Sequence, residues 1–235
     1  MKKLMLFMLA AMLGIVAANA QGTGTVVVAD GTATNQYVPI YGYYVDDFLR
    51  CQTIYPESML TEIAGSEIQG ITYYLSTPAT GSWGSSAVFE VKIGTVAASA
   101  FETTPSWMDV TSFSTVYTGV LDGTQSEMTI NFDAPFTYTS GNLCIEVNVT
   151  TEGSYNRAYF AGMESANASA YGSNGSSWAS ITPTKQNFIP KTGFIVPVSC
   201  VSPTMGTITP EARAASVAWT ENGSASAWQL KLNDG

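Results

Sequence analysis

The chain alternates apolar and polar residues with a period of two, and this pattern restricts its fold most. In Met128–Asp133, the apolar residues Met128, Ile130 and Phe132 alternate with Thr, Asn and Asp. Leu143–Val149 repeats the pattern, with an apolar residue at every second position. Successive side chains of a β-strand point to opposite faces, so this alternation predicts strands with one face on a core and the other in water. Further strands are predicted over residues 25–28, 48–55, 68–75, 87–93, 115–121, 157–160 and 187–198.

The alternation also assigns the side chains of these two segments to faces. The core is predicted to contain Ile130, Phe132, Ile145 and Val147. By the same parity, Asn131 and Glu146 are predicted to face water.

Turn residues separate the strands, and helical periodicity is nearly absent. Asp-Gly stands at 30–31 and 122–123, Ser-Gly at 140–141 and Glu-Gly at 152–153. The exception is Pro56–Leu60, where Pro at a first helical position predicts one or two helical turns. About nine strands in residues 21–198 therefore predict an all-β antiparallel two-sheet sandwich, with a closed barrel as the alternative. Irregular spacing and long loops at 76–86, 94–114 and 161–186 favour a jelly-roll-like sandwich.

The N-terminus has the parts of a secretory signal peptide. Lys2 and Lys3 precede a short apolar run, and Ala18-Asn19-Ala20 is a small-x-small cleavage pattern. We therefore predict export to the extracellular space or cell surface, with cleavage of residues 1–20 and no membrane insertion afterwards. An N-terminal anchor is the less favoured alternative, because the run is shorter than the ~20 apolar residues of a spanning helix.

The remaining 215 residues are enough for a large core and carry a strong negative charge. Without Lys2 and Lys3 there are 7 basic residues against 18 acidic ones, a formal charge of −11. Such a field repels phosphate backbones, so no nucleic-acid partner is expected. Cys51, Cys144 and Cys200 allow at most one disulfide, and the sequence leaves the three possible pairings open.

The chain contains no histidine, which removes most hydrolytic and metal-based catalysis. Ser-His-Asp and Cys-His constellations and His-ligated zinc sites all need that residue. Carboxylate pairs remain, at Asp46-Asp47, at Glu62 and Glu67, and near Asp109, but acids on loops are usually solvated. We therefore predict that the chain is not an enzyme.

Two kinds of loop residue are candidates for binding. Asp30, Asp46 and Asp47 stand at turns and have the oxygen ligands of a structural calcium ion, although turn-forming solvated acids are the interpretation that we favour. Flat aromatic rings on small polar loops can stack on sugars or on an apolar patch of a partner. The candidates are Trp83, Trp178, Tyr41, Tyr43 and Tyr44. Burial in the core is the favoured alternative for these rings, because large aromatic residues are highly buried on average.

The composition changes near Cys200. Val201–Thr204 is predicted to be a linker, so we divide the chain into residues 1–20, 21–198 and 199–235. Beyond the linker, residues 216–220 and 228–232 are predicted to form two strands joined by a polar turn at 221–225.

Several segments resemble the N-terminal modules of Bacteroidetes-type secreted surface, or adhesin-like, proteins. The resemblance rests on Tyr37–Tyr44, Cys51–Glu57, Ile68–Leu75, Val116–Val120, Phe132–Phe136, Asn142-Leu143 and Gly175–Trp178. The tail is similar to the first three strands of a fibronectin type III domain, with Pro203 at its start, Trp219 on the second strand and Trp228 on the third. Met205 replaces the usual Leu, and the later strands are missing. This resemblance implies a modular protein with further domains and gives no catalytic residues.

The expected function is therefore a non-catalytic surface or adhesion-type interaction module, with a host or matrix protein or a glycan as partner. The alternative is a carbohydrate-binding accessory module of an extracellular peptidase or glycoside hydrolase. A purely structural spacer is compatible with the same residues.

Overall fold

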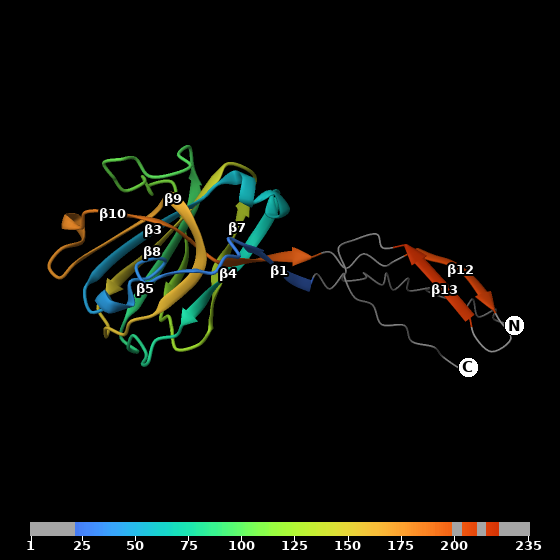
Figure 1. Cartoon of the computed structure of the whole chain (residues 1–235), viewed down its shortest axis with the longest axis horizontal. Helices are drawn as coiled ribbons and strands as arrows, with labels where there is room; N and C mark the ends of the chain where they lie inside the picture. The colour runs from blue at the N-terminus through green and yellow to red at the C-terminus, as the bar shows by residue number, and fades with distance from the viewer. Residues whose placement is uncertain (1–21, 199–203, 211–214, 221–235) are drawn as a thin grey trace, which may run out of the picture. The chain divides into compact units, whose positions relative to one another are not determined.

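The computed structural model describes residues 22–198, 204–210 and 215–220. The chain divides into two compact units, of which one is Thr23–Pro197. The other contains a hairpin of two strands (Figure 1).

The larger unit is built from eleven strands, and the described residues include no α-helix, only single 3-10 turns. The first strands are β1 (Gly22–Val28), β2 (Ala33–Asn35), β3 (Phe48–Tyr55), β4 (Ser66–Thr77), β5 (Val88–Val96) and β6 (Ser114–Gly119). They are followed by β7 (Glu127–Tyr138), β8 (Asn142–Thr151), β9 (Tyr159–Asn174), β10 (Thr184–Pro190) and β11 (Thr192–Val198). The prediction of an all-β chain is confirmed.

These strands form one curled antiparallel sheet. The order along its main path is β1-β11-β4-β9-β3-β8-β5-β6. Three strands lie off this path: β7 pairs with β4, and both β2 and β10 pair with β9. The long strand β9 bends across the sheet and links its two halves, because it pairs with β3 at one end and with β4 at the other (Figure 1).

The two halves of the sheet share one hydrophobic core. Ile71 and Ile130 come from β4 and β7, and Leu49, Val147 and Val91 come from β3, β8 and β5, yet all five belong to one buried cluster. The curl turns the apolar faces of both halves inward, which removes their side chains from water.

Most of the predicted strands are confirmed. The segment 48–55 coincides with β3, and Met128–Asp133 and Leu143–Val149 lie within β7 and β8. The predicted short helix is a single 3-10 turn, Glu57–Met59, directly after Pro56. Ile130, Ile145 and Val147 are buried, Phe132 packs half-buried against the core, and Asn131 is exposed, as their parity predicted.

Two predicted boundaries are wrong. The long loop expected at 161–186 is mostly the strand β9, whose residues Ala161 to Asn174 are polar, small or glycine except for Met163 and Tyr171, and do not alternate. The pairing of β9 with β3 and β10 compensates for its weak sequence signal. The single strand expected at 187–198 is two strands, because the chain leaves β10 at Pro190 and begins β11 at Thr192.

The prediction that Glu146 faces water is also wrong, because its side chain is fully buried. β8 lies between β3 and β5, and its second face is covered by the loop of residues 97–113. Phe101 from that loop forms a second buried cluster with Ile54 and Cys144, and Trp107 packs against it. Alternation correctly divided β8 into two faces, but the second face meets protein instead of water.

A buried polar network lies under this loop. Both Nε and Nη2 of Arg50 lie 2.7 Å from Oε2 of Glu146. Gln52 donates from Nε2 to the same oxygen at 2.5 Å, and Asn148 donates from Nδ2 to Oε1 at 2.8 Å. The amide of Gln52 also exchanges two hydrogen bonds with the backbone of Met108, which holds the covering loop to the sheet.

The cysteines of β3 and β8 lie on opposite faces of the sheet. Cys51 belongs to the shared core and Cys144 to the cluster under the covering loop, and neither forms a disulfide. Burial raises the pKa of both thiols well above the ordinary range. A bridge between these two cysteines is therefore excluded, and Cys200 lies outside the described residues.

The hairpin after the larger unit consists of β12 (Thr204–Pro210) and β13 (Ala215–Thr220), which pair antiparallel. In the register of this hairpin, Met205 pairs with Trp219 and Ile208 pairs with Val217. The strand predicted at 216–220 is thus confirmed. The strand predicted at 228–232 and its turn lie outside the described residues.

Within the described part of the chain, no helix is long and apolar enough to cross a membrane.

Candidate binding site

Two loops meet at the end of the sheet where β3 begins. The first contains residues 41–47, with the 3-10 turn η1 (Gly42–Tyr44), and the second contains residues 152–158. Backbone hydrogen bonds join them, from Asn156 N to Gly42 O and from Gly153 N to Val45 O, both 2.8 Å long. These two bonds fix the position of each loop relative to the other.

The buried residue Trp83 holds both loops in place from the core side. Its side chain has no exposed surface, and its Nε1 donates to the carbonyl oxygen of Asn156 at 2.7 Å. Ser154 N donates to the carbonyl of Trp83, also at 2.7 Å. Gly42 packs so closely on Asn156 and Trp83 that a side chain there would overlap both. Trp83 is therefore a core residue that positions the loops, and its ring cannot stack on a ligand in this structure.

Three tyrosine rings project from these loops into solvent. Tyr43, Tyr44 and Tyr155 are 40%, 37% and 60% exposed. The ring of Tyr43 lies 5.5 Å from that of Tyr44 at an interplanar angle of 84°, and 5.6 Å from that of Tyr155 at 60°. The three ring faces thus point in different directions around a common space.

Further tyrosines support the exposed ones. Tyr41 is half-buried, with its ring 5.0 Å from that of Tyr44, and it packs edge-on against Tyr171 of β9. Tyr37 stacks on Tyr171 at 4.6 Å. Burial is the main cause that raises the pKa of the Tyr41 and Tyr171 hydroxyls, so these groups remain neutral and can donate hydrogen bonds.

Asp46 and Asp47 complete a pocket of about 310 Å³ with Tyr43, Tyr44 and Tyr155. We call this set of five residues the Tyr–Asp pocket. Asp46 is exposed, and Asp47 is half-buried beside Gly175 in the loop after β9. Burial, and next the neighbouring charge of Asp46, raise the pKa of the Asp47 carboxyl. The lining therefore combines three aromatic faces with two carboxylates and no basic side chain.

The third predicted calcium ligand lies elsewhere. Asp30 is exposed after β1 and pairs with Lys191 at 2.5 Å. Within the described ranges, no three acidic or cysteine side chains are grouped so that they could hold a metal ion. The structure thus brings together Asp46 and Asp47 but not Asp30.

Trp178 is also outside the pocket lining. Its half-buried ring lies 5.6 Å from the guanidinium carbon of Arg50, and its Nε1 donates to the carbonyl of Val149 at 3.2 Å. Trp107 lies 4.7 Å from the same guanidinium carbon. Trp178 thus helps to cover the buried network of β3 and β8.

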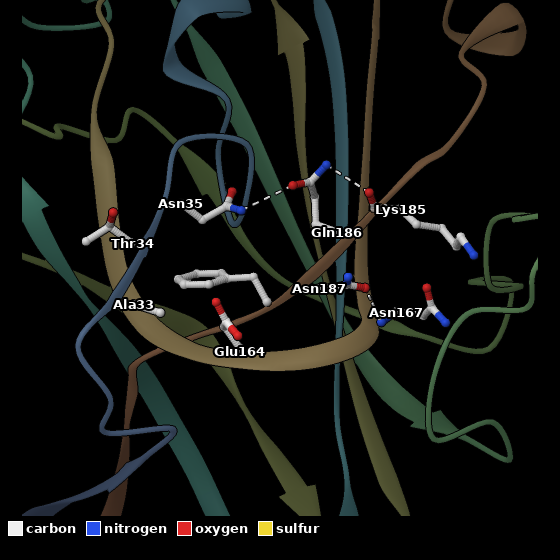
Figure 2. A pocket seen from close by; sticks show the side chains of 9 residues that line it. Ala33, Thr34, Asn35, Glu164, Asn167, Lys185, Gln186 and Asn187 are labelled. Atoms are coloured by element: carbon white, nitrogen blue, oxygen red, sulfur yellow. Dashed lines mark hydrogen bonds between the residues drawn. The ribbon is translucent and has the colours of Figure 1, made fainter.

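A second hollow, of about 540 Å³, lies between β2, β9 and β10 (Figure 2). Amide side chains dominate it, and several already bond to protein groups: Asn35 donates to Gln186 at 3.2 Å, and Asn187 accepts from Asn167 N at 2.9 Å. Its one aromatic residue, Phe188, is buried. This hollow therefore offers no exposed ring for stacking, in contrast to the Tyr–Asp pocket.

Comparison with protein families, with curated proteins and with solved structures finds no significant match. The functional argument therefore rests on the geometry of the site.

Sequence reasoning missed Tyr155 and Arg157 of the second loop. Arg157 places its guanidinium carbon 5.1 Å from the ring of Tyr43 and donates to the hydroxyl of Tyr159. The available signal was the sequence Gly153-Ser154-Tyr155, an aromatic residue after a small polar turn, as at Trp83. The contact between the two loops spans more than 100 positions in sequence, so spacing could not reveal it.

Proposed function

We propose that the chain is a non-catalytic, adhesion-type binding module of an exported surface protein, and that the Tyr–Asp pocket holds one sugar residue of a glycan. The observation that carries the proposal is the convergence of three exposed tyrosine rings and two carboxylates from two separate loops in one pocket. Surface aromatic residues gathered in this way present apolar faces that the fold itself does not use.

The chemistry of the pocket suits a saccharide. The C–H face of a pyranose is apolar and packs on a tyrosine ring, while its rim of hydroxyl groups donates to carboxylate oxygens. Tyr155, with the most exposed ring of the three, is the stacking residue in this proposal, and Asp46 and Asp47 accept the hydroxyl protons. The volume is at the lower limit of small-molecule sites, which suits one sugar unit and not a long oligosaccharide laid along the surface.

The wider setting of the module is also part of the proposal. The signal-peptide pattern of residues 1–20 supports export. A jelly-roll-like two-sheet sandwich is our proposed classification of the larger unit, supported by the curl of its sheet and the irregular strand spacing. The antiparallel β12-β13 hairpin supports a fibronectin type III-like tail, because the first two strands of such a domain pair in this way.

The test is binding of the exported chain to immobilised cellohexaose, chitohexaose, glucosamine hexamer, mannohexaose and xylohexaose, followed by calorimetry on those that retain it. We expect micromolar to millimolar binding to at least one. Tyr155→Ala should weaken it about tenfold, the equivalent of about 1.4 kcal/mol for one lost aromatic contact. Tyr74→Ala is the matched control, because Tyr74 is a half-buried tyrosine of β4 outside the pocket.

Two results contradict the proposal. Failure of the wild-type chain to bind any of the five glycans would remove the saccharide as the ligand of this module. Binding that is weakened equally by Tyr155→Ala and Tyr74→Ala, or by neither, would place the glycan at another surface.

A further inference from the structure

We infer that the sugar held by the Tyr–Asp pocket carries a free ammonium group, as in a glucosamine residue without its acetyl group. This inference rests on the proposed function and concerns the selectivity of the same five residues.

The first argument is the arrangement of the rings. A neutral sugar stacks best on one flat platform, whereas Tyr43 stands at 84° to Tyr44 and at 60° to Tyr155. Ring faces that surround a compact space in this way are the arrangement that holds an organic cation, because each face carries partial negative charge. The arrangement of the rings therefore favours a sugar that carries a small cationic group over a neutral sugar.

The second argument is the charge of the lining. Asp46 and Asp47 stand side by side on this pocket, and among the residues that the structure describes neither has an ion-pair partner. Adjacent carboxylates without a cation repel each other, and an ammonium group bound between them would relieve that repulsion. Burial, and next the charge of Asp46, raise the pKa of the Asp47 carboxyl, and a bound ammonium group would oppose the second of these two effects.

The third argument is that one of these rings already contacts a cation. Arg157 lies over Tyr43 at 5.1 Å but is not part of the pocket lining. Even with its positive charge beside Tyr43, the combined charge of Asp46, Asp47 and Arg157 is negative. An ammonium group of the ligand would thus meet a site of opposite charge. It would also meet tyrosine rings, one of which already contacts a cation in this structure.

The experiment compares three hexasaccharides by calorimetry on the full chain: glucosamine, N-acetylglucosamine and glucose hexamers. A pH of about 6 keeps the sugar amine protonated, since it titrates near an α-amino group, and keeps ordinary carboxyls ionised. We expect the glucosamine hexamer to bind at least about tenfold more tightly than the other two. The double variant Asp46→Asn with Asp47→Asn should abolish this preference.

Because the chain is acidic, it also attracts the positively charged glucosamine hexamer without any specific site. A variant with the same change in net charge outside the pocket controls for this attraction. Glu62→Gln with Glu67→Gln makes the same change in net charge on two exposed side chains that do not line the pocket. It should retain the tenfold preference. Equal loss of preference in the two double variants would overturn the inference as a non-specific charge effect.

The remaining outcomes separate the inference from the proposed function. Equal affinity for the three hexasaccharides, with loss of binding in Tyr155→Ala, would overturn the ammonium selectivity and leave the glycan site in place. No binding of any hexasaccharide would overturn both. Binding of a lysine hexapeptide as tightly as the glucosamine hexamer would also overturn the inference, because the pocket would then recognise cations of proteins and not a sugar.

Discussion

Replacing Glu146 with alanine should destabilise the larger unit strongly, although its place in the alternating pattern of β8 suggested a harmless surface change. The carboxylate is fully buried, accepts one hydrogen bond from each of three side chains and forms an ion pair with Arg50. Removing it leaves the guanidinium of Arg50, whose side chain is only 15% exposed, without its counter-ion.

The magnitude follows from the groups that lose their partners. Gln52 retains its hydrogen bonds with the backbone of Met108, so it contributes little to the loss. Asn148 loses the acceptor of its Nδ2, and its Oδ1 has no partner in the first place. An unpaired buried donor costs about 1–3 kcal/mol, and breaking a buried ion pair by removing one member costs about 3–5 kcal/mol in total. We therefore expect about 3–5 kcal/mol for Glu146→Ala.

Urea unfolding followed by tryptophan fluorescence measures this difference. With an m value of about 2 kcal/mol per molar urea, the midpoint should fall by roughly 1.5–2.5 M. The control is Glu90→Ala on the neighbouring strand β5, where Glu90 pairs with Lys92 at 2.8 Å and both side chains are a quarter exposed. That pair should contribute about 0.2–1 kcal/mol. Similar midpoints for Glu146→Ala and the wild-type protein would show that the network is open to water and that residues 97–113 do not cover it.

Four further outcomes are expected from the same structure. Ile145→Ala should lower the free energy of unfolding by about 2–5 kcal/mol and Asn131→Ala by no more than about 0.5 kcal/mol, measured by urea unfolding; equal effects would refute the face assignment. In a variant without the third cysteine, Cys51 and Cys144 should not react with a thiol reagent until the protein unfolds, and early reaction would contradict their burial. Their raised pKa values should also make stability fall as pH rises above about 8.5, where only unfolded thiols ionise. Deleting residues 203–235 should leave the melting temperature of the larger unit nearly unchanged, whereas a large drop would mean that the tail is part of its cooperative fold.

Local pattern was enough to predict the strands that keep a strict alternation. β3 coincides with its predicted range, and β7 and β8 contain theirs, because side-chain parity depends only on neighbouring residues. β9 was missed beyond Phe160, because its sequence of small and polar residues forms a strand only through the partners on both of its edges. Its existence depends on contacts that a local window does not contain.

Burial of the second face of β8 could not be predicted for the same physical reason. Alternation separates two faces but does not tell what covers each of them. The cover comes from residues 97–113, where Phe101, Trp107 and Phe113 lie in a segment without regular structure. Aromatic residues in a long irregular loop were the available sign that the loop packs on something.

The candidate site was partly predictable, because Tyr41 to Asp47 are contiguous in sequence and share a loop. The sequence could not reveal the role of Trp83, which belongs to neither pocket loop. Its ring and its backbone carbonyl both form hydrogen bonds with the backbone of the second loop, at Asn156 and Ser154. Its ring also packs against Phe89 of β5 at 5.7 Å, so the loops rest directly on the core. A pocket held in this way loses little conformational freedom when a ligand binds, which favours affinity from a small contact area. In the proposed function, the buried tryptophan that was a candidate for ligand contact would instead act through rigidity, by keeping Tyr43, Tyr44 and Tyr155 in place before the ligand arrives.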